Sequence, residues 1–202
     1  MIYQKATFLK SAALLNQLPE DAGIEVAFAG RSNAGKSSAI NSITNIKRLA
    51  HASKTPGRTQ LINLFSLDET RRIVDLPGYG YAQVPQEVKE RWQKTLARYL
   101  TERECLKGLM LMMDIRRPLM PHDKEMLDWA VRCSLPVHIL LTKADKLSRT
   151  KMLTTLRGVH DHFSSHAPLV SVQIFSIPLQ LGIIEAREQL DKWFFGGDVV
   201  EE

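Results

Sequence analysis

Residues 24–37 of this 202-residue chain read IEVAFAGRSNAGKS. Residues 24–29 form a short, mostly apolar run, which is typical of a strand buried on both faces. Residues 30–37 fit the pattern G-x-x-x-x-G-K-[ST], and a helical pattern begins at Lys36. A strand, a glycine-rich turn and a helix in this order predict a loop whose inward-facing N–H groups hold phosphate oxygens.

The residue types within this loop suit phosphate binding. Gly30 and Gly35 let the backbone curl, Lys36 can reach the β- and γ-phosphates of a nucleotide, and Ser37 offers a hydroxyl to Mg²⁺. The other residues predicted to contact the nucleotide here are Arg31, Ser32, Asn33, Ala34 and Ser38.

Apolar runs of strand length alternate with longer helical patterns along the rest of the chain. This alternation predicts an α/β fold, with a mostly parallel sheet and helices on both faces. A turn at residues 68–71 permits one antiparallel strand. The predicted strands are residues 24–29, 61–67, 72–76, 108–113, 136–141 and 169–175, and the predicted helices are residues 36–46, 86–102, 123–133, 148–163 and 182–193.

A second motif, D-x-x-G, ends the predicted third strand. Asp75 would hold Mg²⁺ through water and the Gly78 N–H would meet the γ-phosphate, with Leu76 and Pro77 between them. A threonine in the irregular segment 47–60 could add a hydroxyl ligand for Mg²⁺. Thr59 is favoured over Thr55 because it adjoins the next strand.

A third motif, [NT]-K-x-D, follows the predicted strand at residues 136–141. The Asp145 carboxylate can accept two hydrogen bonds from the donor edge of guanine, and adenine has no such donor pair. Lys143 would lie along the ring face, and Thr142 replaces the more frequent asparagine. The residues predicted to contact the base are Thr142, Lys143, Ala144 and Asp145, together with Phe175, Ser176 and Ile177 at the end of the last strand. Pro178, the next residue, departs from the usual pattern because it has no N–H.

Composition limits the function classes. A net charge of +5 and a pI near 9.3 favour polyanionic partners such as RNA, although many ordinary enzymes carry such a charge. Arg116 and Arg117 could touch RNA or shape their own loop. The two cysteines show no disulfide or metal pattern. Without a secretory signal or a long apolar run, we expect a cytoplasmic chain with no membrane partner.

The motifs GRSNAGKSS, TPGRTQ, DLPGYGYA, DIRRPLMPHD and TKADK together resemble the EngB (YihA/YsxC-type) family of the TrmE–Era–EngA–EngB class. The resemblance implies a six-stranded Ras-like P-loop fold, Mg²⁺-dependent binding of GTP or GDP, a role in large-ribosomal-subunit assembly, and a requirement in cell division and septation. It also implies Mg²⁺ ligation by Ser37 and Thr59. From the segment before the second strand it implies nucleotide contacts by Gly57, Arg58, Thr59, Gln60 and Leu61.

Slow hydrolysis is expected. Ras-type enzymes carry a glutamine after D-x-x-G that orients the attacking water, and here Tyr79 occupies that position. Asn33 could ligate K⁺, or it could be a turn residue that tolerates unusual backbone angles. The residues predicted to act in catalysis are Lys36, Thr59, Gly78 and Asn33.

Residues 1–22 are predicted to be an N-terminal extension, 23–195 the G domain and 196–202 a short tail, in a monomeric protein. Two alternatives to a GTPase switch stay open. One is a P-loop kinase or ATPase acting on a small metabolite, and the other is a scaffold that binds GTP without significant turnover.

Overall fold

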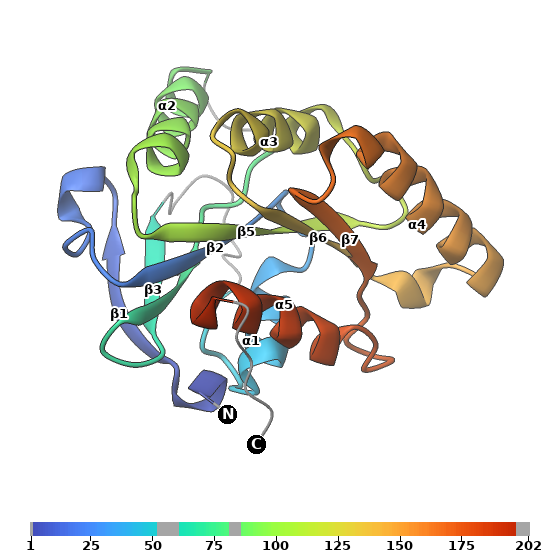
Figure 1. Cartoon of the computed structure of the whole chain (residues 1–202), viewed down its shortest axis with the longest axis horizontal. Coiled ribbons are helices and arrows are strands. Elements are labelled where there is room, and N and C mark those ends of the chain that lie inside the picture. The colour runs from blue at the N-terminus through green and yellow to red at the C-terminus, as the bar shows by residue number, and fades with distance from the viewer. Residues whose placement is uncertain (1, 52–60, 81–85, 197–202) are drawn as a thin grey trace.

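The computed structural model describes residues 2–51, 61–80 and 86–196. These residues form a seven-stranded sheet in the order β1-β3-β4-β2-β5-β6-β7, flanked by helices on both faces (Figure 1). β3 runs antiparallel to β1 and β4, and the other neighbouring strands pair in parallel. The strands are β1 Thr7–Ala12, β2 Ile24–Gly30, β3 Ile62–Ser66, β4 Arg71–Asp75, β5 Leu106–Asp114, β6 Val137–Thr142 and β7 Val170–Ile174.

Two apolar cores lie on opposite faces of the sheet. Helices α1 and α5 cover one face, and α2, α3 and α4 cover the other (Figure 1). The α-helices are α1 Lys36–Thr44, α2 Gln86–Glu102, α3 Pro121–Arg132, α4 Arg149–His162 and α5 Ile183–Phe195. Short 3-10 helices occupy η1 Ile2–Lys5, η2 Leu15–Gln17, η3 Ala144–Lys146 and η4 Ser164–His166.

The α/β fold with helices on both faces is confirmed, but the count of six strands was wrong. The seventh strand is β1, which lies inside the segment predicted to be an N-terminal extension and pairs with β3 at the sheet edge. Of its six residues only Ala12 is buried, and the Phe8 side chain is 59% exposed. Because an edge strand buries little, its sequence lacks the apolar pattern that marks a core strand.

The predicted helix ends differ from the observed ones by at most two residues, and local backbone geometry explains several of the differences. α1 stops at Thr44 because Asn45 adopts a left-handed conformation, with φ of 57°. α5 begins after Gly182, whose φ of 81° suits glycine. In α4, Ser148 caps the first turn by accepting a hydrogen bond from the Lys151 N–H.

The central strands bring the sequence motifs together. β2 lies between β4 and β5, and all three run in parallel. Phe28 pairs with Asp75, and Gly30 pairs with Met112. The carboxyl ends of β2, β4, β5 and β6 therefore lie at one edge of the sheet, which is where ligands bind in open α/β folds.

Candidate nucleotide-binding site

The loop between β2 and α1 has the geometry that its glycines predict. A side chain at Gly30 would place a Cβ 2.9 Å from the Met112 carbonyl oxygen, so β2 can approach β5 only with glycine here. Gly35 adopts φ of 94° and caps α1, whose free N–H groups then face the loop. Asn33 is exposed and also left-handed, with φ of 63°. That conformation agrees with its reading as a turn residue.

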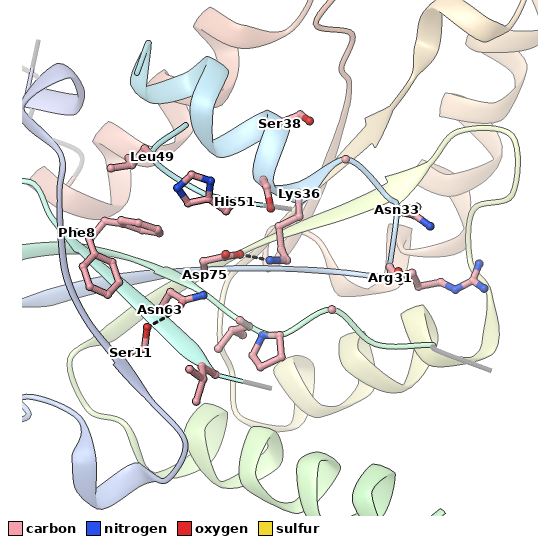
Figure 2. A pocket seen from close by; sticks show the side chains of 18 of the residues that line it. Phe8, Ser11, Arg31, Asn33, Lys36, Ser38, Leu49, His51, Asn63 and Asp75 are labelled. Atoms are coloured by element: carbon pink, nitrogen blue, oxygen red, sulfur yellow. Dashed lines mark hydrogen bonds and ion pairs between the residues drawn. The ribbon is translucent and has the colours of Figure 1, made fainter. Parts of the chain in front are cut away.

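A cavity of about 690 Å³ opens beside this loop. Figure 2 shows Lys36 from α1 and Asp75 from the end of β4 pointing toward each other inside it. The two side chains form an ion pair, and Asp75 is 4% exposed. Ser37 lines the same cavity one residue further along α1. An ammonium, a hydroxyl and a carboxylate therefore meet where a polyphosphate and its cation could bind.

The D-x-x-G segment is tied to the phosphate loop by its backbone. The Leu76 N–H donates to the Phe28 carbonyl at 3.0 Å, and the Ser32 N–H donates to the Tyr79 carbonyl at 2.8 Å. Leu76, Pro77 and Gly78 line the cavity. The Tyr79 side chain is buried and is not among the residues that line the cavity.

The T-K-x-D loop lies against the phosphate loop. The Thr142 hydroxyl donates to the Ala34 carbonyl at 2.6 Å and also lies 3.1 Å from the Met113 carbonyl. The Lys143 ammonium donates to the Asn33 carbonyl at 2.6 Å and pairs with Asp114 at 3.0 Å. Threonine in place of asparagine therefore still joins the two loops, because its hydroxyl reaches the backbone of the phosphate loop.

Asp145 is oriented by the last strand segment. The Ser176 hydroxyl donates to Asp145 Oδ1 at 2.8 Å, and Lys146 pairs with the other oxygen at 3.1 Å. The Ser176 hydrogen bond, with Lys146, lowers the pKa of Asp145 below its usual value, so the group is a carboxylate at neutral pH. The Ser176 N–H donates to the Leu181 carbonyl at 2.9 Å and is therefore not free to contact a base.

The three remaining members of the base set are buried or partly buried, and Phe175 is 1% exposed. Ala144 is 1% exposed, and its N–H donates to the Phe175 carbonyl at 3.3 Å. Ile177 is partly buried against the core on the α1 and α5 side. The structure thus brings the phosphate loop, Asp75–Gly78 and the T-K-x-D loop to one sheet edge.

Some predicted residues lie outside the part of the chain that the structure describes, and some lining residues were not predicted. Gly57, Arg58, Thr59 and Gln60 lie outside the described residues, whereas Leu61 lines the cavity. Phe8 and Ser11 from β1, Asn63 from β3, and His51 also line it, as Figure 2 shows. No sequence pattern indicated these residues, and Phe8, Ser11 and Asn63 are brought together by the pairing of β1 with β3.

Comparison with known proteins decides the family. A family model described as "50S ribosome-binding GTPase" matches residues 25–143. The relative from Photorhabdus laumondii, named "Probable GTP-binding protein EngB", is 54% identical over 192 residues, which cover 95% of this chain and 91% of that protein. The chain belongs to the EngB family of GTP-binding proteins. An EngB relative from Coxiella burnetii is 53% identical, with coverage of 95% and 94%.

Membership in the EngB family makes this chain a P-loop GTPase whose ligand is a guanine nucleotide. Solved structures support the fold. A crystal structure of a probable GTP-binding protein engB has a TM-score of 0.69 at 22% identity, covering 84% of this chain and 98% of that one. Era in complex with MgGDPNP and nucleotides 1506–1542 of 16S ribosomal RNA has a TM-score of 0.63 at 20% identity, covering 85% and 57%.

Among residues 2–51, 61–80 and 86–196, no helix combines the length and the apolar character that crossing a bilayer requires.

Proposed function

We propose that this EngB-family GTPase binds GTP with Mg²⁺ in the 690 Å³ cavity and serves as a nucleotide-dependent switch in assembly of the large ribosomal subunit. One observation carries the nucleotide half of the proposal. The Lys143 ammonium reaches the Asn33 carbonyl at 2.6 Å, so a base-selecting loop and a phosphate-binding loop form one continuous site. The family description "50S ribosome-binding GTPase" supports the ribosomal half.

In this proposal the N–H groups of the loop at residues 30–37, other than those of Ser32 and Ala34, hold the α- and β-phosphates, because these two donate to protein carbonyls. Lys36 neutralises the β- and γ-phosphates. When a nucleotide binds, Lys36 would break its ion pair with Asp75 and contact the phosphates instead. The Asp145 carboxylate accepts hydrogen bonds from guanine, held in place by Ser176. Gly78 offers its N–H to the γ-phosphate.

The residues present fit Mg²⁺. The Ser37 hydroxyl and the Asp75 carboxylate are hard oxygen donors in the same cavity, and Mg²⁺ prefers a few such protein ligands beside phosphate and water. Thr59 remains a proposed third ligand outside the described residues. Bound Mg²⁺ would neutralise charge on the β- and γ-phosphate oxygens.

Charge beside the site supports an RNA-rich partner. A second cavity of about 490 Å³ is lined by Arg31, Arg116, Arg117 and Lys143. Arg116 is engaged by Asp114 at 2.6 Å and shapes its own loop, whereas the Arg117 side chain is exposed. A basic surface next to a nucleotide switch suits contact with rRNA phosphates.

Competition with a fluorescent guanine nucleotide tests the proposal that the cavity binds GTP. GTP and GDP should displace it at concentrations at least about a hundredfold lower than ATP, since adenine leaves Asp145 unpaired. Equal displacement by ATP would instead favour a P-loop kinase or ATPase.

Sedimentation with large ribosomal subunits tests the proposed role in assembly of that subunit. The chain loaded with a non-hydrolysable GTP analogue should co-sediment, and the chain loaded with GDP should do so less. Single-turnover assays with and without subunits separate a switch from a scaffold, because a scaffold shows no stimulated turnover. A switch in subunit assembly also leads us to propose that depletion impairs septation, which microscopy of a depletion strain would reveal.

A further inference from the structure

Tyr79, the residue directly after Asp75–Gly78, is anchored to helix α3. Its phenol is 5% exposed and donates a hydrogen bond to Asp123 Oδ1 at 2.9 Å. Asp123 is 1% exposed, and its other carboxylate oxygen accepts from the Met120 N–H at 3.1 Å at the start of α3. One buried carboxylate therefore caps α3 and receives the side chain of the D-x-x-G loop.

The backbone of Tyr79 is bonded to the phosphate loop. Its N–H donates to the Gly30 carbonyl at 3.4 Å, and its carbonyl accepts from the Ser32 N–H at 2.8 Å. Adjacent Cα atoms are about 3.8 Å apart, so holding Tyr79 in place restrains Gly78 as well. Tyr79 thus joins α3, the phosphate loop and the residue proposed to meet the γ-phosphate.

The surroundings keep the Tyr79 phenol neutral, and burial raises the pKa of Asp123, although the Tyr79 hydrogen bond and Arg31 act in the opposite direction. Burial, with the neighbouring Asp123, raises the pKa of Tyr79 well above 10, so the phenol remains a donor at neutral pH. Arg31 acts electrostatically on both groups. Among the described residues, Arg31 Nε is buried with no hydrogen-bond partner, and the Arg31 charge lowers the pKa of Asp123.

We infer that Tyr79 is a positioning residue, whose hydrogen bond to Asp123 holds the neighbouring Gly78 where a γ-phosphate is sensed. The inference rests on the proposed placement of GTP in the cavity. It assigns GTP-versus-GDP discrimination partly to a bond that touches no nucleotide. A glutamine at this position would act on the attacking water, whereas Tyr79 acts through the backbone of its neighbours.

Tyr79→Phe tests this inference because it removes only the hydroxyl. Affinities for GDP and for a non-hydrolysable GTP analogue are measured by fluorescence titration. The ratio of analogue affinity to GDP affinity should fall about tenfold, since only the analogue depends on Gly78 being held in place to meet a γ-phosphate. GDP affinity itself should change by less than about twofold because GDP has no γ-phosphate.

Tyr99→Phe is the matched control. Tyr99 is fully buried in α2, and its phenol donates to the fully buried Glu25 at 2.9 Å, so it loses the same kind of bond. Glu25 lies near the amino end of β2, five residues before Gly30. Tyr99→Phe should lower the melting temperature while leaving the affinity ratio unchanged. An equal shift in the ratio for both variants would reduce Tyr79 to a purely structural role.

Asp123→Ala examines the same bond from its acceptor side, so the test survives if one variant fails to fold. In the double variant that combines Tyr79→Phe with Asp123→Ala, the ratio of analogue affinity to GDP affinity should fall no further than in Asp123→Ala alone, because the two substitutions remove the same interaction. A folded Tyr79→Phe with the wild-type ratio would overturn the inference. Failure of wild type to bind either nucleotide would instead overturn the proposed function.

Discussion

At the scale of single residues, the proposed base selection depends on how Asp145 is held. The Ser176 hydroxyl and Lys146 contact its two oxygens and lower its pKa. Because the pKa is lowered, the carboxylate form persists as pH falls through the usual value of 3.8. Guanine selection should therefore not change between neutral and mildly acidic pH on account of this residue.

Replacing Asp145 by asparagine should shift the preference from guanine toward xanthine nucleotides. The amide offers one acceptor and one donor group, which mismatches guanine and matches the carbonyl that xanthine carries instead. GTP affinity should fall at least about a hundredfold while XTP affinity rises. Competition titration measures both. Asp161→Asn, an exposed change in α4, is the control, and a retained guanine preference would remove Asp145 from the base pocket.

At Asn33 the role of the amide side chain can be tested separately from the role of the backbone conformation. Its φ of 63° is one that glycine adopts without strain, so Asn33→Gly removes the amide and keeps the loop. If the amide ligates K⁺, wild-type turnover should be faster in K⁺ than in Na⁺, and Asn33→Gly should abolish the difference. Steady-state phosphate release measures the rates. Equal wild-type rates in the two salts would exclude a potassium role.

At the scale of elements, β2 is anchored at both ends. Its carboxyl end leads into the phosphate loop, and near its amino end the buried Glu25 pairs with Arg72 at 3.0 Å and Arg103 at 2.8 Å. Burial alone would raise the pKa of Glu25, but hydrogen bonding and charge from Arg103, with Tyr99 and Arg72, lower it overall. This cluster joins β2, β4 and the end of α2.

Glu25→Ala should destabilise the fold by about 3–5 kcal/mol, because two arginines lose a buried partner. Urea denaturation at neutral pH measures the change. Since the folded pKa is depressed, the stabilisation is fully present above the usual value of 4.5 and is lost as pH falls through the folded value. The gap between variant and wild type should therefore narrow below pH 4.5.

Glu102→Ala, which breaks an exposed ion pair with Arg98 on the same helix, serves as the control for Glu25→Ala. It should cause little measurable change at any pH. If Glu102→Ala lowered the free energy of unfolding as much as Glu25→Ala does, burial would not determine how much these ion pairs contribute to stability.

At the scale of the whole molecule, ligand binding and folding are linked. The site is built from loops after β2, β4 and β6, so a nucleotide contacts the sheet on both sides of β5. Any ligand that binds only the folded state stabilises all of these contacts together.

GDP at about 100 times its Kd should therefore raise the free energy of unfolding by about 2.7 kcal/mol. Lys36→Ala should show no such rise at the same concentration, because the loop loses the cation that neutralises the phosphates. Thermal melting with and without GDP measures this. Lys107→Ala, an exposed lysine at the start of β5, should keep the full effect, and a GDP-stabilised Lys36→Ala would refute the phosphate-loop assignment.

The sequence by itself determined the α/β class, the helices and core strands, and the order of the three motifs. Each of these depends on short segments of sequence whose periodicity or residue types favour a single local conformation. Examples are the left-handed glycine at Gly35 and the apolar run of β6. The tertiary structure alone decided the β1 pairing, the Tyr79–Asp123 bond and the reach of Thr142 to Ala34. Tyr79 and Asp123 lie 44 residues apart, and Thr142 and Ala34 lie 108 apart. Such partners are chosen by how strands and helices pack, and no local pattern encodes that choice.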